Sequence, residues 1–138
     1  MKKTLLRWLV LTAVLVLAIG GCDLIGVSIQ DRVSLFLADL NSLDRSQIYL
    51  NFHPTLTNDY SAIQNETLPD WALLFPTGTY IPYSISGLDT SDPWNVFGSI
   101  NSIDGAWGGA KSIIFRMAKD GPDWMIRELD LDGSNLVN

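Results

Sequence analysis

Hydrophobic residues follow a helical spacing in the first half of the chain and a strand-like alternation in the second half. After Ser28, apolar side chains recur every three or four positions, at Ile29, Val33, Phe36, Leu37 and Leu40. This spacing places them on one face of an α-helix, and Arg32 lies off that face. Ser28 with Asp31 three residues later is typical of a helix N-terminal cap, and Asn41-Ser42 is expected to end the helix.

Prolines divide the next segment into shorter predicted helices: residues 44–53, a turn capped by Thr57, and a turn from Pro69 to Pro76. The first of these carries Ile48 and Phe52 on its inner face. It stops before Pro54, because a residue that precedes proline avoids the α-helical conformation. The N-terminal half of the domain is therefore predicted to be helical.

Apolar and polar residues alternate from residue 81 onward, which is typical of β-strands. Four strands are predicted, over residues 81–86, 96–103, 111–118 and 124–131. Pro82 has no backbone N–H to donate, so the first strand is expected at a sheet edge. The apolar phase shifts between Ile126 and Leu129, and a β-bulge near Arg127-Glu128 would return both to one face. Helices followed by strands predict the α+β class, with the helices packed on a curved antiparallel sheet of about four strands.

The residues ahead of this domain have the three-part layout of a secretory signal. Basic residues come first, then an apolar run, then two small residues, and these are Lys2, Lys3, Arg7, Trp8 to Ile19, Gly20 and Gly21. As a helix, residues 8–21 would extend about 21 Å, less than the ~30 Å hydrocarbon core of a bilayer. A cleaved signal is therefore favoured over a permanent transmembrane helix.

The single cysteine of the chain follows this signal directly. Ile19-Gly20-Gly21-Cys22 resembles the lipobox of bacterial lipoproteins: an aliphatic residue, two small residues and cysteine. The resemblance implies a diacylglycerol thioether on Cys22, cleavage before it, and acylation of the new N-terminus. The alternative is an ordinary signal peptide with a chance cysteine or a free thiol.

These patterns divide the chain into residues 1–21, a lipoprotein signal peptide; residues 22–27, a short lipidated tether; and residues 28–138, a single α+β domain. The expected location is the bacterial cell envelope, with the protein exported from the cytoplasm and held to a membrane by the lipid on Cys22. Asp23 resembles the inner-membrane retention signal of enteric lipoproteins, but the choice between inner and outer membrane stays open.

The charge of the mature chain bears on its partners. Loss of Lys2, Lys3 and Arg7 with the signal would leave six basic residues against fifteen acidic ones, a net charge of about −9. An acidic domain lacks the electrostatic footprint for nucleic acid, and anionic headgroups would repel it. The lipid, and not the surface charge, is expected to hold the protein at the membrane.

The domain resembles the NTF2-like (cystatin-like) cone fold, in which a long helix packs in a curved antiparallel sheet. The resemblance rests on two N-terminal helices, the helix end "NFHP", and the closing "MAKDGPDWMIRELDL" with Gly121, Trp124, Ile126, Leu129 and Leu131. It covers most of the mature chain. The segment from Thr67 to Pro76 has no counterpart in the family pattern.

A catalytic constellation is hard to find in this sequence. His53 is the only histidine, and at a helix end it is more readily explained as a partner of the helix dipole than as a general base. Enzymes of the resembled family use an Asp or His base with a Tyr inside the cone, and Asp39, Tyr49 and Tyr83 are the matching residue types. No cofactor motif is present.

The acidic tail "ELDLDG" invites a metal-site interpretation. Glu128, Asp130, Asp132 and Gly133 match the first half of an EF-hand loop. That loop needs a bidentate glutamate at its twelfth position, which would fall beyond Asn138. We therefore predict no EF-hand and assign no metal site, while weak cation binding stays open. Leu129 and Leu131 are expected to point inward from a strand, and their acidic neighbours to face water.

Two tryptophans receive opposite predictions. Trp124 alternates with Ile126 and is predicted to be a core residue. Trp107 stands in "GAWGG", and its glycine neighbours predict an exposed tip that contacts a ligand or partner. The alternative is that the Trp107 ring lies back on the sheet edge.

Together these patterns predict a lipid-anchored envelope protein that is a non-enzymatic binding or accessory module. Its partner would be a small apolar ligand or an envelope protein, with Trp107, Tyr83 and His53 as candidate contacts. The alternatives are a small enzyme with an Asp/Tyr or His site inside the cone, and a purely structural envelope protein.

Overall fold

The computed structural model of the protein describes residues 26–42, 46–73 and 81–138. The predicted signal peptide and Cys22 lie outside the described residues, as does the end of the Thr67–Pro76 segment. None of the helices in the described ranges is long and apolar enough to cross a membrane.

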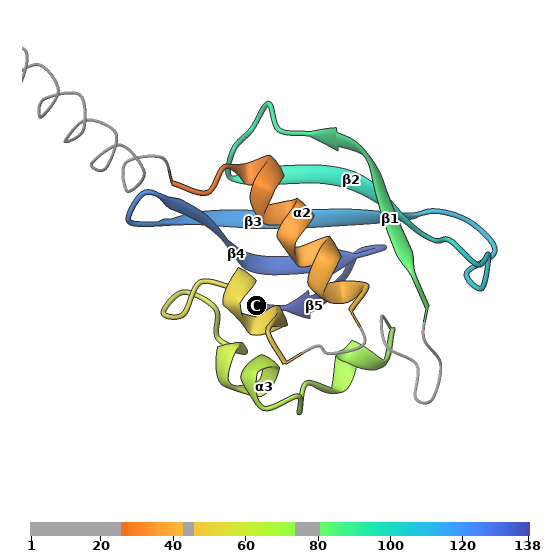
Figure 1. Cartoon of the computed structure of the whole chain (residues 1–138), viewed down its shortest axis with the longest axis horizontal. Helices are drawn as coiled ribbons and strands as arrows, with labels where there is room; N and C mark the ends of the chain where they lie inside the picture. Colours follow the sequence, from red (N-terminus) through yellow and green to blue (C-terminus); the bar gives the residue numbers. More distant parts are fainter. Residues whose placement is uncertain (1–25, 43–45, 74–80) are drawn as a thin grey trace, which may run out of the picture.

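One helix lies across one face of a five-stranded antiparallel sheet (Figure 1). The helix is α2 (Ile29–Leu40), and the strands are β1 (Tyr83–Asp89), β2 (Asn95–Ser102), β3 (Lys111–Asp120), β4 (Asp123–Leu131) and β5 (Ser134–Val137). The strands lie in their sequence order, so β1 is an edge strand as its proline predicted. The predicted α+β class is confirmed.

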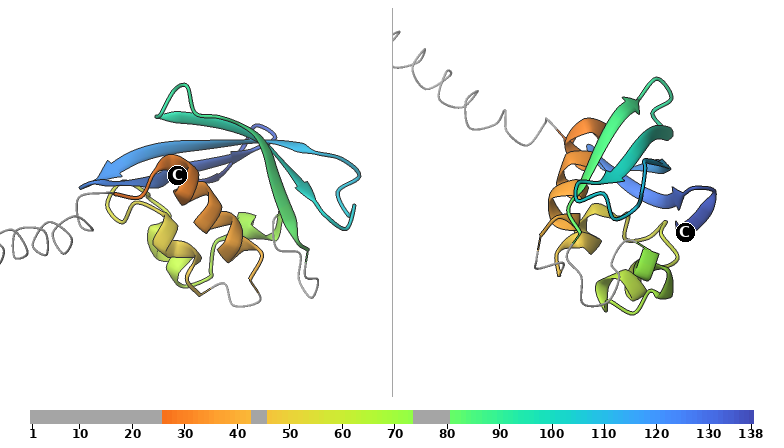
Figure 2. Two further views of the ribbon diagram at one scale, coloured as in Figure 1. Left: turned by 45° about the horizontal axis from the view of Figure 1, so that its top comes forward. Right: turned by 90° about the vertical axis from the view of Figure 1, so that its right-hand side faces the viewer.

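The sheet curves over α2, and the shorter helices lie on the same side of the sheet (Figure 2). They are η1 (Ile48–Asn51), α3 (Tyr60–Gln64) and η2 (Pro69–Leu73), of which η1 and η2 are 3₁₀ turns. The predicted helix over residues 44–53 is thus shorter than expected. Its inner residues are correct, because Ile48 and Phe52 are both buried.

The sequence pattern missed β5. The last predicted strand ends at residue 131, and the two residues that follow it, Asp132 and Gly133, have positive φ, 50° and 81°. Positive φ at two consecutive positions matches the turn that joins two antiparallel strands tightly. The chain therefore reverses, Ser134 pairs with Leu131, and Leu136 and Val137 are buried in the core.

The predicted β-bulge is present in β4. Arg116 pairs with Glu128 and Met117 pairs with Ile126, so Arg127 is the extra residue. The bulge returns Ile126 and Leu129 to the same face, and both are fully buried. A phase shift in hydrophobic alternation was therefore sufficient to locate this irregularity.

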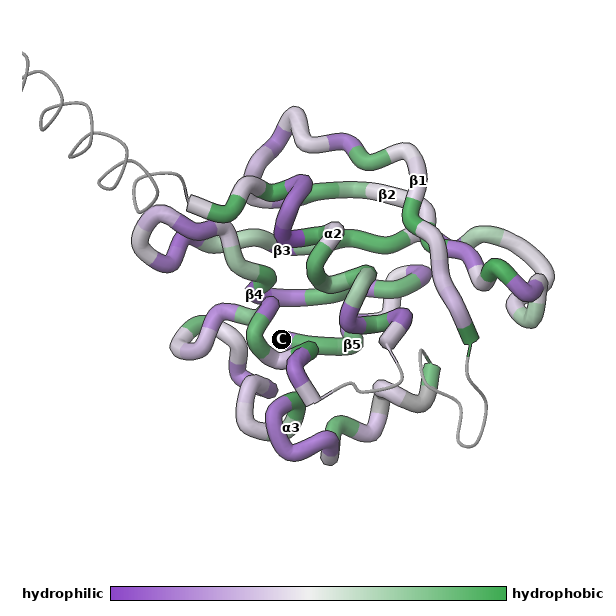
Figure 3. Tube along the Cα trace, in the orientation of Figure 1, coloured by the Kyte–Doolittle hydropathy of each residue, from purple (hydrophilic) through white to green (hydrophobic). Residues whose placement is uncertain are grey.

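The core forms where α2 crosses the middle of the sheet, and Figure 3 shows the hydrophobic positions concentrated there. Phe36 of α2 is at its centre, with no exposed surface. Its ring centroid lies 5.6 Å from that of Phe115 on β3 and 6.0 Å from that of Phe52, both in edge-to-face geometry. The predicted cap is also present, because the Ser28 hydroxyl accepts a hydrogen bond from the Asp31 N–H.

Thr57 does not cap a helix as predicted. Its hydroxyl lies 3.3 Å from the carbonyl oxygen of Ile126 and 3.1 Å from that of Arg127, and donates to them. The His53 N–H also donates to the Ile126 carbonyl, at 2.7 Å. The bulge exposes these carbonyls, and the chain after η1 satisfies them, so this loop is tied to β4.

Arg32 is buried, although it lies off the apolar face of α2. Only 7 % of its surface is exposed. Its Nε donates to the Trp124 carbonyl of β4 at 2.8 Å, and its Nη1 lies 3.4 Å from both the Leu50 carbonyl and Asn51 Oδ1. Burial lowers the pKa of Arg32, while Asp123 and Asp39 act in the opposite direction. This side chain joins α2, η1 and β4 through polar contacts.

Candidate ligand groove

A groove with a cavity volume of about 260 Å³ lies between α2 and β1. It is lined by four apolar side chains and two uncharged polar ones: Val33, Leu37, Ile85, Leu88, Gln30 and Ser34. None of these described lining residues carries a charge. Such a surface can hold an uncharged, largely apolar molecule, with an amide and a hydroxyl available for orientation.

An irregularity in β1 shapes one wall of the groove. The pairing of β1 with β2 shifts register between Ser86 and Asp89, and Gly87 has a φ of 61°. Leu88 then lies over Gly98 of β2, where an added Cβ would lie only 3.3 Å from Leu88 Cδ1. A glycine at this position therefore makes room for the apolar wall.

Hydrogen bonds join α2 to the β1 side of the sheet at both ends of the groove. At one end, Gln30 Nε2 donates to Thr90 Oγ1 at 3.2 Å. At the other end, Asn41 Nδ2 donates to the Tyr83 carbonyl at 2.8 Å, and the Tyr83 N–H donates to Asn41 Oδ1 at 2.7 Å. The Asn41 amide thus pairs with the edge of β1 as a neighbouring strand would. These contacts link α2 and the residue that follows it to the β1 side of the sheet.

The structure brings Trp107 and Tyr83 together, but not as an exposed tip. Tyr83 is 1 % exposed, and its ring centroid lies 4.8 Å from that of Trp107. The Trp107 ring is half-buried, and Lys111 Nζ lies 5.2 Å from its centroid. The backbone N–H of Trp107 donates to Ser102 Oγ at 3.0 Å. The expected free tip is wrong: the ring lies back on the sheet, which was the alternative.

The structure gives His53 a different role from the predicted one of helix-dipole partner. Its Nδ1 accepts hydrogen bonds from the N–H groups of Thr55 and Leu56, both at 3.2 Å. Two donors on Nδ1 place the ring proton on Nε2, which lies 3.2 Å from the Lys119 carbonyl oxygen. His53 is 6 % exposed, so it organises the turn after η1 and holds that turn to β3.

The other candidate catalytic residue types have separate partners. Asp39 Oδ2 accepts a hydrogen bond from Asn51 Nδ2 at 2.7 Å. The Tyr49 ring packs edge-to-face on the Tyr60 ring, with 5.8 Å between the two centroids. Neither Asp39 nor Tyr49 lines the groove, and neither do His53 and Tyr83. The structure does not gather these side chains around one cavity.

The acidic tail is engaged in ion pairs. Arg116 binds Glu128 at 3.0 Å and Asp130 at 3.1 Å, and Lys111 lies 3.5 Å from Asp132. Within the described ranges, no group of three or more His, Cys, Asp or Glu side chains is placed to hold a metal ion.

Trp124 lies on the core face of β4 but is half-buried, not enclosed as predicted. It stands at the end of the β3–β4 hairpin, where its ring meets Trp94 at a centroid distance of 5.2 Å.

The sequence pattern does not predict the groove. Its walls come from α2 and β1, and η1, α3 and η2 lie between these two elements in the sequence. Alternation predicted a strand over residues 81–86, which includes Ile85, but nothing local indicated that Leu88 would line the same groove after a register shift. Gly87 was the available signal, because a glycine within a strand pattern often marks a bulge.

No protein-family model, no curated protein and no solved structure matches the chain.

Proposed function

We propose that this protein is a lipid-anchored binding module of the bacterial cell envelope, which holds a small apolar ligand in the groove between α2 and β1. The observation that carries the proposal is the groove itself, which is lined by four apolar and two uncharged polar side chains. Its volume of about 260 Å³ is slightly below the ~300–1,000 Å³ usual for ligand pockets. The ligand class is therefore a small uncharged molecule or one alkyl segment of a larger one.

We further propose that the domain is an NTF2-like cone. A curved antiparallel sheet with a helix packed across its inner face supports this, together with the closing hairpin from Gly121 to Leu131. We propose binding and not catalysis, because His53 and Tyr83 are both buried and neither lines the groove.

The anchor is tested at Cys22. In cells supplied with radiolabelled palmitate, the wild-type chain should incorporate label, and Cys22→Ser should remain an unlabelled, uncleaved precursor. The physical reason is that the thiol is the nucleophile that accepts the lipid. Asp23→Ser is the control, because it changes the adjacent residue and keeps the thiol. Label in the Cys22→Ser protein would contradict the anchor.

The groove is tested with a neutral dye, N-phenyl-1-naphthylamine, whose fluorescence rises in apolar surroundings. Ser34→Trp would fill the groove from an exposed position whose hydroxyl bonds only within its own helix, to the Gln30 carbonyl. We expect the dye's dissociation constant to rise about tenfold, which corresponds to about 1.4 kcal/mol of binding free energy.

Ala38→Trp is the matched control for this test. Ala38 is exposed on the same helix and does not line the groove. Its variant should bind the dye as the wild type does, with both variants folded by circular dichroism. Equal binding by all three proteins, or no binding by any, would contradict the groove as the ligand site.

A further inference from the structure

The described chain begins against the turn between β3 and β4. A Cβ at Gly26 would collide with the Pro122 carbonyl, so a side chain has no room there. The Val27 N–H donates to Asp123 Oδ1 at 2.8 Å, and the Trp124 N–H donates to the Val27 carbonyl at 3.0 Å. The start of the domain is therefore fixed to one end of the sheet.

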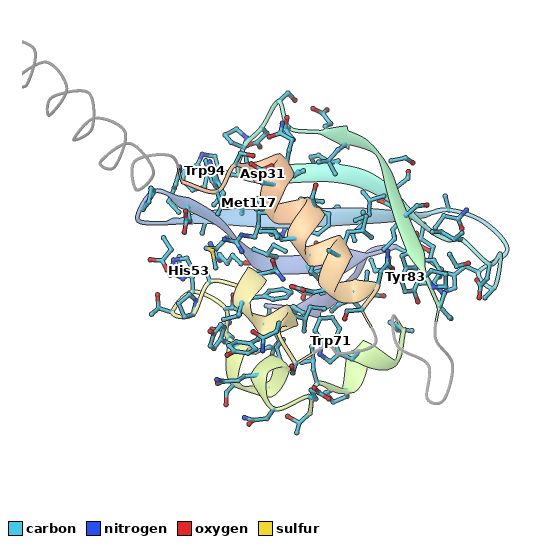
Figure 4. The ribbon with its side chains drawn as sticks, viewed as in Figure 1. Asp31, His53, Trp71, Tyr83, Trp94 and Met117 are labelled. Atoms are coloured by element: carbon cyan, nitrogen blue, oxygen red, sulfur yellow. The ribbon has the colours of Figure 1, made fainter. Side chains whose placement is uncertain are left out.

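Two tryptophans and a lysine gather at this same end, which we call the tryptophan end: Trp94, Trp124 and Lys119. Trp94 is 54 % exposed and is the most exposed tryptophan of the described residues. Its ring stacks edge-on against Trp124, and Lys119 Nζ lies 4.7 Å from the Trp124 ring centroid. Figure 4 shows Trp94 beside the point where the described chain starts.

The loop that carries Trp94 is held by hydrogen bonds. The Trp94 N–H donates to Asp92 Oδ1 at 2.9 Å, and its carbonyl accepts from the Met117 N–H at 2.9 Å. The Asn95 side chain and the Trp94 N–H lower the pKa of Asp92. The Asp92 carboxylate is therefore ionised at neutral pH, where it accepts these two hydrogen bonds. The Trp94 backbone is therefore hydrogen-bonded through both its N–H and its carbonyl.

The exposure of the Trp94 side chain matters because Trp94 lies close in space to the chain segment that follows Cys22. A single exposed apolar side chain is ordinary on a protein surface. Here, however, the four residue steps from Cys22 to Gly26 span at most about 14 Å. If Cys22 carries the lipid, the tryptophan end is the part of the domain nearest the bilayer. Tryptophan prefers the membrane–water interface, because its ring is apolar and its N–H is polar.

We propose that the tryptophan end docks on the bilayer, with the Trp94 ring inserted among the headgroups. The proposal rests on the lipid anchor proposed above, which brings this end to the membrane. The surrounding carboxylates of Asp92, Asp120 and Asp123 disfavour an anionic surface. The partner is therefore a zwitterionic phospholipid interface. Docking here fixes the orientation of the domain and leaves the opposite end of the sheet, with Trp107, away from the membrane.

The test uses the full chain expressed in bacteria, purified in detergent and reconstituted into phosphatidylcholine vesicles. Part of the phosphatidylcholine carries brominated acyl chains, which quench nearby indoles. We expect the vesicles to quench wild-type tryptophan fluorescence, and Trp94→Phe to lower the quenched fraction by about half, because Trp94 is the indole placed in the interface.

Trp107→Phe is the matched control, since it removes an indole from the opposite end of the sheet. It should leave the quenched emission unchanged and remove only unquenched emission. A quenched fraction in Trp94→Phe equal to that of the wild type, or no quenching of the wild type, would overturn the docked surface. Palmitate labelling of the same preparation separates the two proposals: label without Trp94 quenching rejects only the orientation, and Trp94 quenching without label rejects only the anchor.

Discussion

Replacement of Arg32 by alanine should lower the free energy of unfolding by about 3 kcal/mol, because each buried polar group left unpaired costs about 1–3 kcal/mol. The change removes the 2.8 Å bond to the Trp124 carbonyl and the longer contacts to Leu50 and Asn51. It also removes the packed alkyl part of the side chain. Urea unfolding followed by circular dichroism measures the effect.

Arg127→Ala is the matched control for this prediction. The Arg127 side chain is 52 % exposed and pairs with Glu128 at 2.8 Å. An exposed ion pair contributes about 0–1 kcal/mol, so this variant should unfold almost as the wild type does. Arg32→Lys should also be less stable than the wild type, because a single ammonium cannot reproduce the fork of donors on guanidinium. Equal losses in Arg32→Ala and Arg127→Ala would contradict a structural role for the buried arginine.

Phe36→Ala should be at least as damaging, with a loss of about 3–5 kcal/mol from the free energy of unfolding. Phe36 has no exposed surface, and its ring meets those of Phe52 and Phe115 at 6.0 and 5.6 Å. Truncation would leave a cavity between α2 and β3 that this packed core cannot close. A domain of this size has about 5–15 kcal/mol of stability in total, so the variant should be close to unfolding at room temperature.

Phe97→Ala removes the same side chain from the other face of the sheet. Phe97 is 47 % exposed, and it alternates with the buried Val96 on β2. Its loss should change stability by less than about 1 kcal/mol. If Phe36→Ala fails to fold, Phe36→Leu keeps most of the volume and should still be less stable than Phe97→Leu. Similar melting temperatures for the Phe36 and Phe97 variants would contradict the assignment of Phe36 to the centre of the core.

Arg32 shows why a helical pattern predicts secondary structure better than burial. Its position off the apolar face suggested a surface residue, as for its neighbour Asp31. The guanidinium reaches past that face to carbonyls on β4 and η1, which lie about 20 to 90 residues away in sequence. Those acceptors exist only once the helix, the 3₁₀ turn and the bulged strand have come together.

Trp107 shows the same limitation in a loop. Its three glycine neighbours correctly predicted an irregular connection between β2 and β3. They did not reveal that the Tyr83 ring would offer a surface at 4.8 Å for the indole. Glycine lowers the cost of unusual backbone conformations, but whether a nearby aromatic is exposed depends on what the rest of the fold places beside it.

The sequence by itself determined the α+β class, the extent and cap of α2, the edge position of β1 and the bulge at Arg127. Each of these follows from local spacing, from a cap or from proline chemistry, which act within a few residues. The tertiary structure alone decided the burial of Arg32, the bonds around His53, the groove between α2 and β1, and the meeting of Trp94 with Trp124. These features depend on contacts between distant segments, and such contacts leave no periodic trace in either segment taken alone.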